Sequence, residues 1–137
     1  TRHEQANGAL YLFIQDSIEW LDHAKGAIAN FHIVFMIQLS FHLGFMPNIE
    51  SGMSGDYFDL VDGCFAAHVP SHVHYLNKED SMRLVSLFRL DYKTMHLYTM
   101  SRIERNRCVE VILEYYKLHL PDFPEMKSFS VLQELFA

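Results

Sequence analysis

The chain of 137 residues has few cysteines, few cations and none of the common hydrolytic motifs. Its two cysteines, Cys64 and Cys108, are too few for a disulfide scaffold and form no C-x-x-C pair, which favours a reducing cytoplasmic location. Eleven Lys and Arg against seventeen Asp and Glu give a formal net charge of −6, which argues against chain-wide neutralisation of nucleic-acid phosphates. The motifs G-x-S-x-G and H-E-x-x-H and a glycine-rich phosphate loop are absent, so we expect no enzyme.

The chain is rich in apolar residues, and its charges are unevenly distributed along the sequence. Apolar residues make up 50% of the sequence and charged residues 20%, enough to bury a core, and the length fits one domain over residues 1–137. Only Arg2 and Lys25 of the eleven cations lie in residues 1–77, leaving nine for residues 78–137. Any anion-binding surface is therefore expected in the second half.

One segment is long enough to be weighed as a membrane span. Residues 27–46 contain no charged side chain over twenty positions. Their polar side chains would lie on all sides of a helix, where lipid could not satisfy them: Asn30, His32, Gln38, Ser40 and His42. The segment therefore predicts a central buried helix of a soluble domain, without a membrane partner.

The other patterns predict an all-α, mainly helical single domain with one small β-hairpin. Gly44 and Pro47 end the buried helix, and Gly63 belongs to an Asp-Gly turn between strands at 58–61 and 64–67. Apolar spacing and capping residues predict four further helices, at 8–23, at 78–90 after Asn77, from the Ser101/Glu104 capping box to about Leu120, and at 129–136 after Ser128.

A weak metal-binding pattern lies near the hairpin. Four potential zinc ligands fall within eleven residues: Cys64, His68, His72 and His74. Their spacing matches no common zinc finger, and nine histidines make some clustering expected by chance, so we expect no metal and a polar loop. The carboxylates of Asp56, Asp59 and Asp62 are expected to form a solvated rim.

Cations of the second half form a candidate DNA-binding set because guanidinium and ammonium groups contact phosphates well. The set is Arg83, Arg89, Lys93, Arg102, Arg107 and Lys127. Arg105 differs because helical spacing places it beside Val109, Ile112 and Tyr116. We expect it to be structural and to bridge a buried carboxylate or carbonyl.

At this point an ordered set of residues resembles a known family. It comprises the stretch LGFMPN at 43–48, Phe58-Asp59-Leu60 with Gly63 and Phe65, and the run ERNRCVEVILEYYKLHLPDFPEMKSFSVLQELF at 104–136. These stretches are similar in order and spacing to RecO, the bacterial mediator of recombinational repair. The resemblance extends from about Leu10 onward.

The resemblance implies a function for the full-length protein. RecO proteins carry an OB-fold domain followed by a helical domain, and only the helical domain is similar to this chain. The family binds single- and double-stranded DNA, anneals strands and acts with RecR. It also docks the C-terminal tail of single-stranded DNA-binding protein and helps to load RecA on gaps. This chain alone is expected to bind DNA weakly, and a nucleoid-associated cytoplasmic location follows.

Two family features depart from the pattern here. Many members carry a four-cysteine zinc site, but residues 49–57 hold no cysteine and the second pair would fall near Ala67 and Pro70, so we expect no cofactor. In some relatives the tail-docking site uses arginines where residues 29–32 here read Ala-Asn-Phe-His, without a permanent positive charge. Two alternatives stay open: a small helical metal-dependent enzyme or regulator using the Cys64–His74 cluster, and a purely protein-docking helical module.

Overall fold

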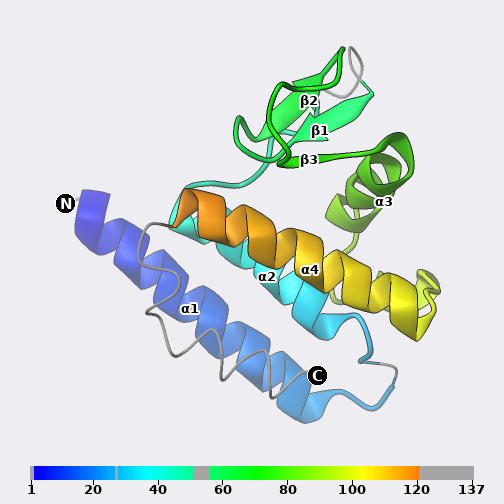
Figure 1. Cartoon of the computed structure of the whole chain (residues 1–137). Coiled ribbons are helices and arrows are strands. Elements are labelled where there is room, and N and C mark those ends of the chain that lie inside the picture. The colour runs from blue at the N-terminus through cyan, green and yellow to red at the C-terminus, as the bar shows by residue number, and fades with distance from the viewer. Residues whose placement is uncertain (1, 27, 51–55, 121–137) are drawn as a thin grey trace.

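The computed structural model describes residues 2–26, 28–50 and 56–120 of the chain (Figure 1). Within these residues the helices are α1 (Arg2–His23), α2 (Phe31–Leu43), α3 (Lys78–Phe88) and α4 (Arg102–His119), with a 3-10 turn η2 (Met95–Leu97) before α4. The strands are β1 (Tyr57–Asp59), β2 (Cys64–Ala66) and β3 (Tyr75–Leu76). The predicted mainly helical class is confirmed.

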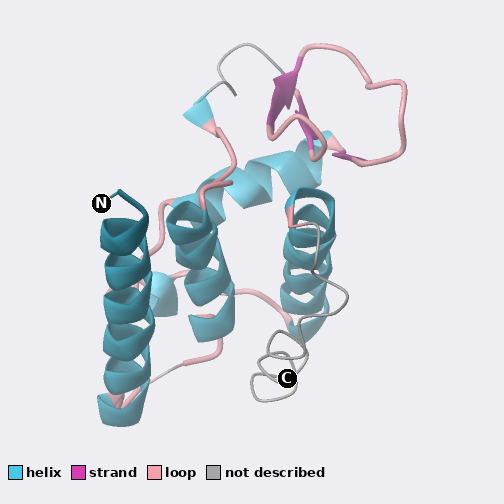
Figure 2. Cartoon of the chain, turned by 90° about the vertical axis from the view of Figure 1, so that its left-hand side faces the viewer, coloured by secondary structure: helices cyan, strands magenta, loops and turns pink. Residues whose placement is uncertain are grey.

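Helix α2 is the centre of the fold. It packs against α1 on one side and α4 on the other, and Figure 2 shows these helices side by side with α1 next to the N mark. Its buried residues point in all directions: Phe31, Ile33, Val34, Phe35, Ile37, Leu39 and Ser40. The prediction of a buried core helix is confirmed. The helix is shorter than the uncharged run of residues 27–46, and no described helix is long and apolar enough to cross a membrane.

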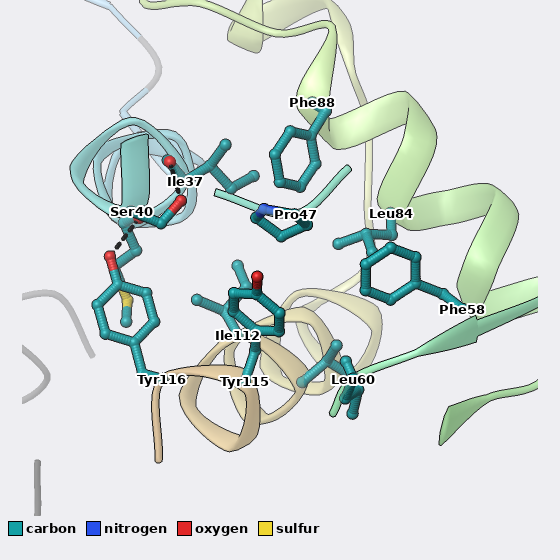
Figure 3. A pocket seen from close by; sticks show the side chains of 12 residues that line it. Ile37, Ser40, Pro47, Phe58, Leu60, Leu84, Phe88, Ile112, Tyr115 and Tyr116 are labelled. Carbon is teal, nitrogen blue, oxygen red and sulfur yellow. Dashed lines mark hydrogen bonds between the residues drawn. The ribbon is translucent and has the colours of Figure 1, made fainter. Parts of the chain in front are cut away.

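Gly44 ends α2 in the left-handed conformation, at φ 90°, and its N–H donates to the carbonyl of Phe41. A residue with a Cβ adopts this conformation at a cost, which explains the glycine. Pro47 follows and lines a small apolar hollow between α2, α3, α4 and β1 (Figure 3). The chain thus turns from the helices into the sheet at this point.

The predicted hairpin is part of a three-stranded antiparallel sheet with the order β2-β1-β3. The hairpin pairs Phe58 with Phe65, but its turn spans the four residues 60–63 rather than Asp62-Gly63 alone. β3 was not predicted from the sequence because two residues show no alternation. It pairs with β1 through Phe58 and Leu76, and the N–H of Phe58 donates to Oγ of Ser81 on α3.

The two capped helices of the second half are confirmed. The side chain of Asn77 accepts the N–H of Asp80 at the start of α3, and Ser101 and Glu104 form the capping box of α4. Helix α4 buries Cys108, Val111, Ile112, Tyr115 and Tyr116. The helix expected at 129–136, its cap Ser128 and the cation Lys127 lie outside the described residues.

Candidate nucleic-acid interface

Two of the predicted DNA-binding cations lie in an ion-pair network between α3 and α4. The side chain of Arg83 is 18% exposed, and its Nη2 lies 3.0 Å from a carboxylate oxygen of Glu104. Arg83 also lies 3.6 Å from carboxylate oxygens of Glu79 and of Asp80. Nε of Arg107 lies 3.2 Å from Oδ2 of Asp80. We call this set, completed by Glu110 beside Arg107, the α3–α4 network.

The α3–α4 network is unsuited to phosphate binding. Its two guanidinium groups face four carboxylates, so an approaching phosphate would meet a surplus of negative charge. The N–H of Ser101, which donates to the carboxylate of Glu104, and the charge of Arg83 hold the pKa of Glu104 below its usual value. Glu104 therefore stays ionised, and the arginines of this network stabilise the contact between the helices.

Three other predicted cations are exposed and lie outside the α3–α4 network. Arg89 follows α3, Lys93 lies in the connection to η2, and Arg102 is the first residue of α4. None of the ion pairs within residues 2–26, 28–50 and 56–120 involves them. We call this surface, formed by residues 89–102, the exposed corner; in Figure 1 it joins the end of α3 to the yellow start of α4.

The single carboxylate of the exposed corner is used to shape its backbone. Oδ1 of Asp91 accepts the N–H groups of Thr94 and Lys93, at 2.9 and 2.8 Å, and the hydroxyl of Thr94. The bond from the Thr94 N–H is the largest cause that lowers the pKa of Asp91, so this carboxyl stays ionised. The corner also exposes a large apolar side chain, Leu97 at 72%, and Ile103, the next residue in the chain after Arg102, is 82% exposed.

A buried polar clamp holds the exposed corner against α2. Nδ2 of Asn30, which is 5% exposed, donates to the carbonyls of Met95 and Tyr98, each at 2.9 Å. Oδ1 of Asn30 accepts from Nε of Arg105 at 3.3 Å, and Nη2 of Arg105 donates to the carbonyl of Met100 at 3.3 Å. The predicted structural residue Arg105 thus lies between a carbonyl and an amide oxygen, with no carboxylate partner within the described residues.

The clamp also brings a charge to the beginning of α2. Burial, and then the charge of Arg105, lower the pKa of His32, so His32 is neutral near pH 7. Arg105 itself keeps its charge because guanidinium groups do not lose their proton in proteins. The sequence comparison of residues 29–32 overlooked this cation because Arg105 is distant in sequence.

The four weak metal candidates are not gathered around one point. Within the described residues no group of three or more His, Cys, Asp or Glu side chains is placed to hold a metal ion. Nε2 of His72 lies 3.0 Å from the carboxylate of Asp59, and Nδ1 of His74 lies 2.9 Å from Oε1 of Glu114. Cys64 lies in β2 and His68 is exposed in the loop that follows.

The prediction of a solvated rim was wrong for Asp59, which is 5% exposed. Its carboxylate accepts the N–H groups of Val61 and Asp62 at 2.9 and 3.0 Å, as well as the contact from His72. Burial acts to raise the pKa of Asp59, but these hydrogen bonds outweigh burial and lower it. Asp59 therefore shapes the β1–β2 turn, where Gly63 at φ 70° completes the reversal.

Comparison with known proteins finds a family model and curated relatives that match this chain. The family model described as "Recombination protein O C terminal" matches residues 1–128. The chain is 46% identical over 136 residues to the DNA repair protein RecO of Phocaeicola vulgatus, covering 99% of this chain and 56% of that protein. It is 48% identical over 136 residues to the DNA repair protein RecO of Bacteroides fragilis, covering 98% of this chain and 56% of that protein.

A more distant relative, the DNA repair protein RecO of Porphyromonas gingivalis, is 34% identical over 137 residues, again with 98% of this chain and 56% of that protein covered. The chain thus spans about half the length of the curated relatives that it matches. No solved structure matches significantly.

Proposed function

We propose a function from one premise: the chain belongs to the RecO family of DNA repair proteins. Its proposed role is that of the helical domain of a non-catalytic mediator of recombinational repair. In the full-length protein this domain assists binding of single- and double-stranded DNA, annealing of complementary strands and loading of the recombinase RecA at gaps. A cytoplasmic, nucleoid-associated location belongs to the same proposal.

The observation that carries the DNA part of the proposal is the exposed corner. Its three cations lie outside the described ion pairs and can approach phosphates without giving up an internal partner. Three contacts and a net charge of −6 support only weak binding by this chain alone, with a Kd of ~10⁻⁴ M near physiological salt. Arg83 and Arg107 contribute little, because a phosphate would have to displace their carboxylates.

Partner proteins form the second part of the proposal. RecR and the C-terminal tail of single-stranded DNA-binding protein are proposed as direct partners of the full-length protein, and RecA as an indirect one. The position of Arg105 at the beginning of α2 supports tail docking there, since an acidic segment would meet a permanent positive charge next to Asn30. The placement of His72 and His74 beside carboxylates gives no support to a metal-dependent enzyme or regulator.

The DNA part is tested by binding of a fluorescent single-stranded oligonucleotide to this chain, with amide chemical shifts followed by NMR. We expect shifts at residues 89–102 and a several-fold loss of affinity in Arg89→Gln/Lys93→Gln/Arg102→Gln. The matched control is Arg83→Gln/Arg107→Gln, which removes cations already engaged in the α3–α4 network. Equal losses in both variants would contradict the assignment, and no detectable binding at low salt would favour a purely protein-docking module.

A further inference from the structure

Helix α1 has an outer face that nothing in the described chain covers. Its inner side packs on α2, with Ser17 1% exposed and Phe13 stacked on Phe35. On the other side Tyr11 is 67% exposed, Leu12 57% and Ile18 55%. Tyr11 and Ile18 lie seven residues apart, two turns along the same side of the helix. Large exposed side chains at this spacing are typical of a helix that packs against a partner helix.

Unneutralised carboxylates lie among these apolar side chains. Asp16, Glu19 and Asp22 are exposed. By helical spacing Glu19 and Asp22 lie on the same side of α1 as Tyr11 and Ile18, and Asp16 lies beside Leu12 at the edge of that side. None of the ion pairs within the described part of the chain involves them, whereas the carboxylates of the α3–α4 network are each paired with an arginine. We call Tyr11, Leu12, Asp16, Ile18, Glu19 and Asp22 the outer face of α1. It combines apolar contact area with uncompensated negative charge.

The negative charge of this face determines which kind of partner can bind to it. A second copy of the chain would bring carboxylates against carboxylates across a symmetric contact, because a two-fold interface joins the same patch to itself. A nucleic acid would present phosphates, which the same carboxylates repel. A segment with Lys or Arg beside its apolar side chains would instead gain both apolar burial and charge complementarity.

We propose that the outer face of α1 docks an amphipathic helix of another protein, with apolar side chains at helical spacing flanked by Lys or Arg. Tyr11 and Ile18 are the anchors, and Asp16, Glu19 and Asp22 orient the partner by attracting its cations. This site lies on the outer side of α1, whereas Tyr92 of the exposed corner contacts the inner side of α1 at Ser17 and Trp20. The proposal does not depend on DNA binding.

The test uses this chain and a synthetic helical peptide of about 18 residues, made only of Leu and Lys, with Leu on one face. Binding is measured by fluorescence anisotropy at about 150 mM salt, where exposed charges are partly screened. Anchors at the centre of an interface are each worth more than about 1 kcal/mol, so Tyr11→Ser/Ile18→Ser should weaken binding by about tenfold or more. The apolar control, Val73→Ser/Met82→Ser, removes exposed side chains elsewhere and should change binding by less than about twofold.

A second pair of variants, which removes charge, distinguishes docking on α1 from non-specific attraction of the peptide to an acidic chain. Asp16→Asn/Asp22→Asn should weaken binding by about threefold, because exposed ion pairs contribute only a fraction of a kcal/mol each. Glu50→Gln/Asp62→Asn removes the same charge from exposed positions outside α1 and should leave binding unchanged. Amide shifts should map to α1, and a peptide with Glu in place of Lys should not bind.

Three results would overturn the proposal. Equal losses in the two charge variants would show that the peptide responds to net charge alone. Unchanged binding by Tyr11→Ser/Ile18→Ser would show that the apolar anchors are not used. Self-association of this chain, seen by sedimentation and abolished by Tyr11→Ser, would identify a second copy as the occupant.

Discussion

Asn30 is the residue on which the exposed corner depends most directly. Its side chain is buried, and its amide donates to two carbonyls of the segment 95–100 while its oxygen accepts from Arg105. Asn30→Ala removes all three hydrogen bonds: the carbonyl of Tyr98 loses its amide donor, and the carbonyl of Met95 keeps only the N–H of Tyr98, at 3.3 Å. At about 1 kcal/mol for each bond, with an added cost for the unsatisfied carbonyl, the variant should lose roughly 2–4 kcal/mol of stability.

Two further substitutions separate the donor role of Asn30 from simple loss of volume. Asn30→Asp keeps the shape and the acceptor for Arg105 but turns an oxygen toward the carbonyls of Met95 and Tyr98, so it should also be destabilised. Arg105→Ala should cost about 1–2 kcal/mol, because its two hydrogen bonds of 3.3 Å are long and half-exposed. Asn106→Ala, on the exposed side of α4, should change stability by less than about 0.5 kcal/mol.

The assay is urea unfolding followed by far-UV circular dichroism, with amide hydrogen exchange of residues 95–100 as the local readout. Asn30→Ala and Arg105→Ala should be non-additive in the double variant, since they remove the same contact. Wild-type stability of Asn30→Ala would refute the reasoning, because it would show that the hydrogen bonds of this amide do not stabilise the fold. Unchanged exchange at residues 95–100 in Asn30→Ala would do the same.

Three further predictions concern the rest of the fold. Gly63→Ala should lower the free energy of unfolding, measured with urea, by more than Gly44→Ala does. Both glycines have a positive φ, which costs a residue with a Cβ about 1–2 kcal/mol. At Gly63 the Cβ would also lie 3.1 Å from the hydroxyl of Tyr115, whereas at Gly44 it would meet open space. Burial raises the pKa of Tyr92 and of Tyr115 to about 12, so the folded state binds these protons more tightly than the unfolded state does. The stability that this provides is complete below pH ~10 and should be lost as the pH rises toward 12. The urea midpoint measured at each pH checks this, and a midpoint that does not change with pH would contradict the burial. Arg83→Ala should lose about 1–2 kcal/mol because three carboxylates share this one guanidinium, and a loss no greater than that of an exposed-corner arginine would disprove its structural role.

Much of the architecture could be predicted from local patterns. The uncharged run that contains α2, the side-chain cap at Asn77 and the capping box at Ser101 each depend on neighbours a few residues away, and the structure has all three. β3 could not be predicted, because a two-residue strand is specified by its pairing with β1 and not by its own sequence.

The candidate interface was only partly predictable for the same reason. Six cations could be named from residue type, but which of them stay exposed depends on the packing of α3 against α4. Arg83 meets Glu104 from 21 residues away, a contact that no spacing rule reveals. Nothing near Asn30 in the sequence indicates its role, because its amide donates to carbonyls 65 and 68 residues further along the chain. Asp59 was misjudged because its burial follows from the turn that it stabilises.

The salt dependence of single-stranded DNA binding tests the central claim most directly. For this chain, three phosphate contacts predict a slope of log affinity against log salt of about −2, since each contact on a single strand contributes roughly −0.7. The slope should fall toward zero in Arg89→Gln/Lys93→Gln/Arg102→Gln and stay near about −2 in Arg83→Gln/Arg107→Gln. A slope that drops equally in both variants, or one that neither variant changes, would contradict the assignment of DNA contact to the exposed corner.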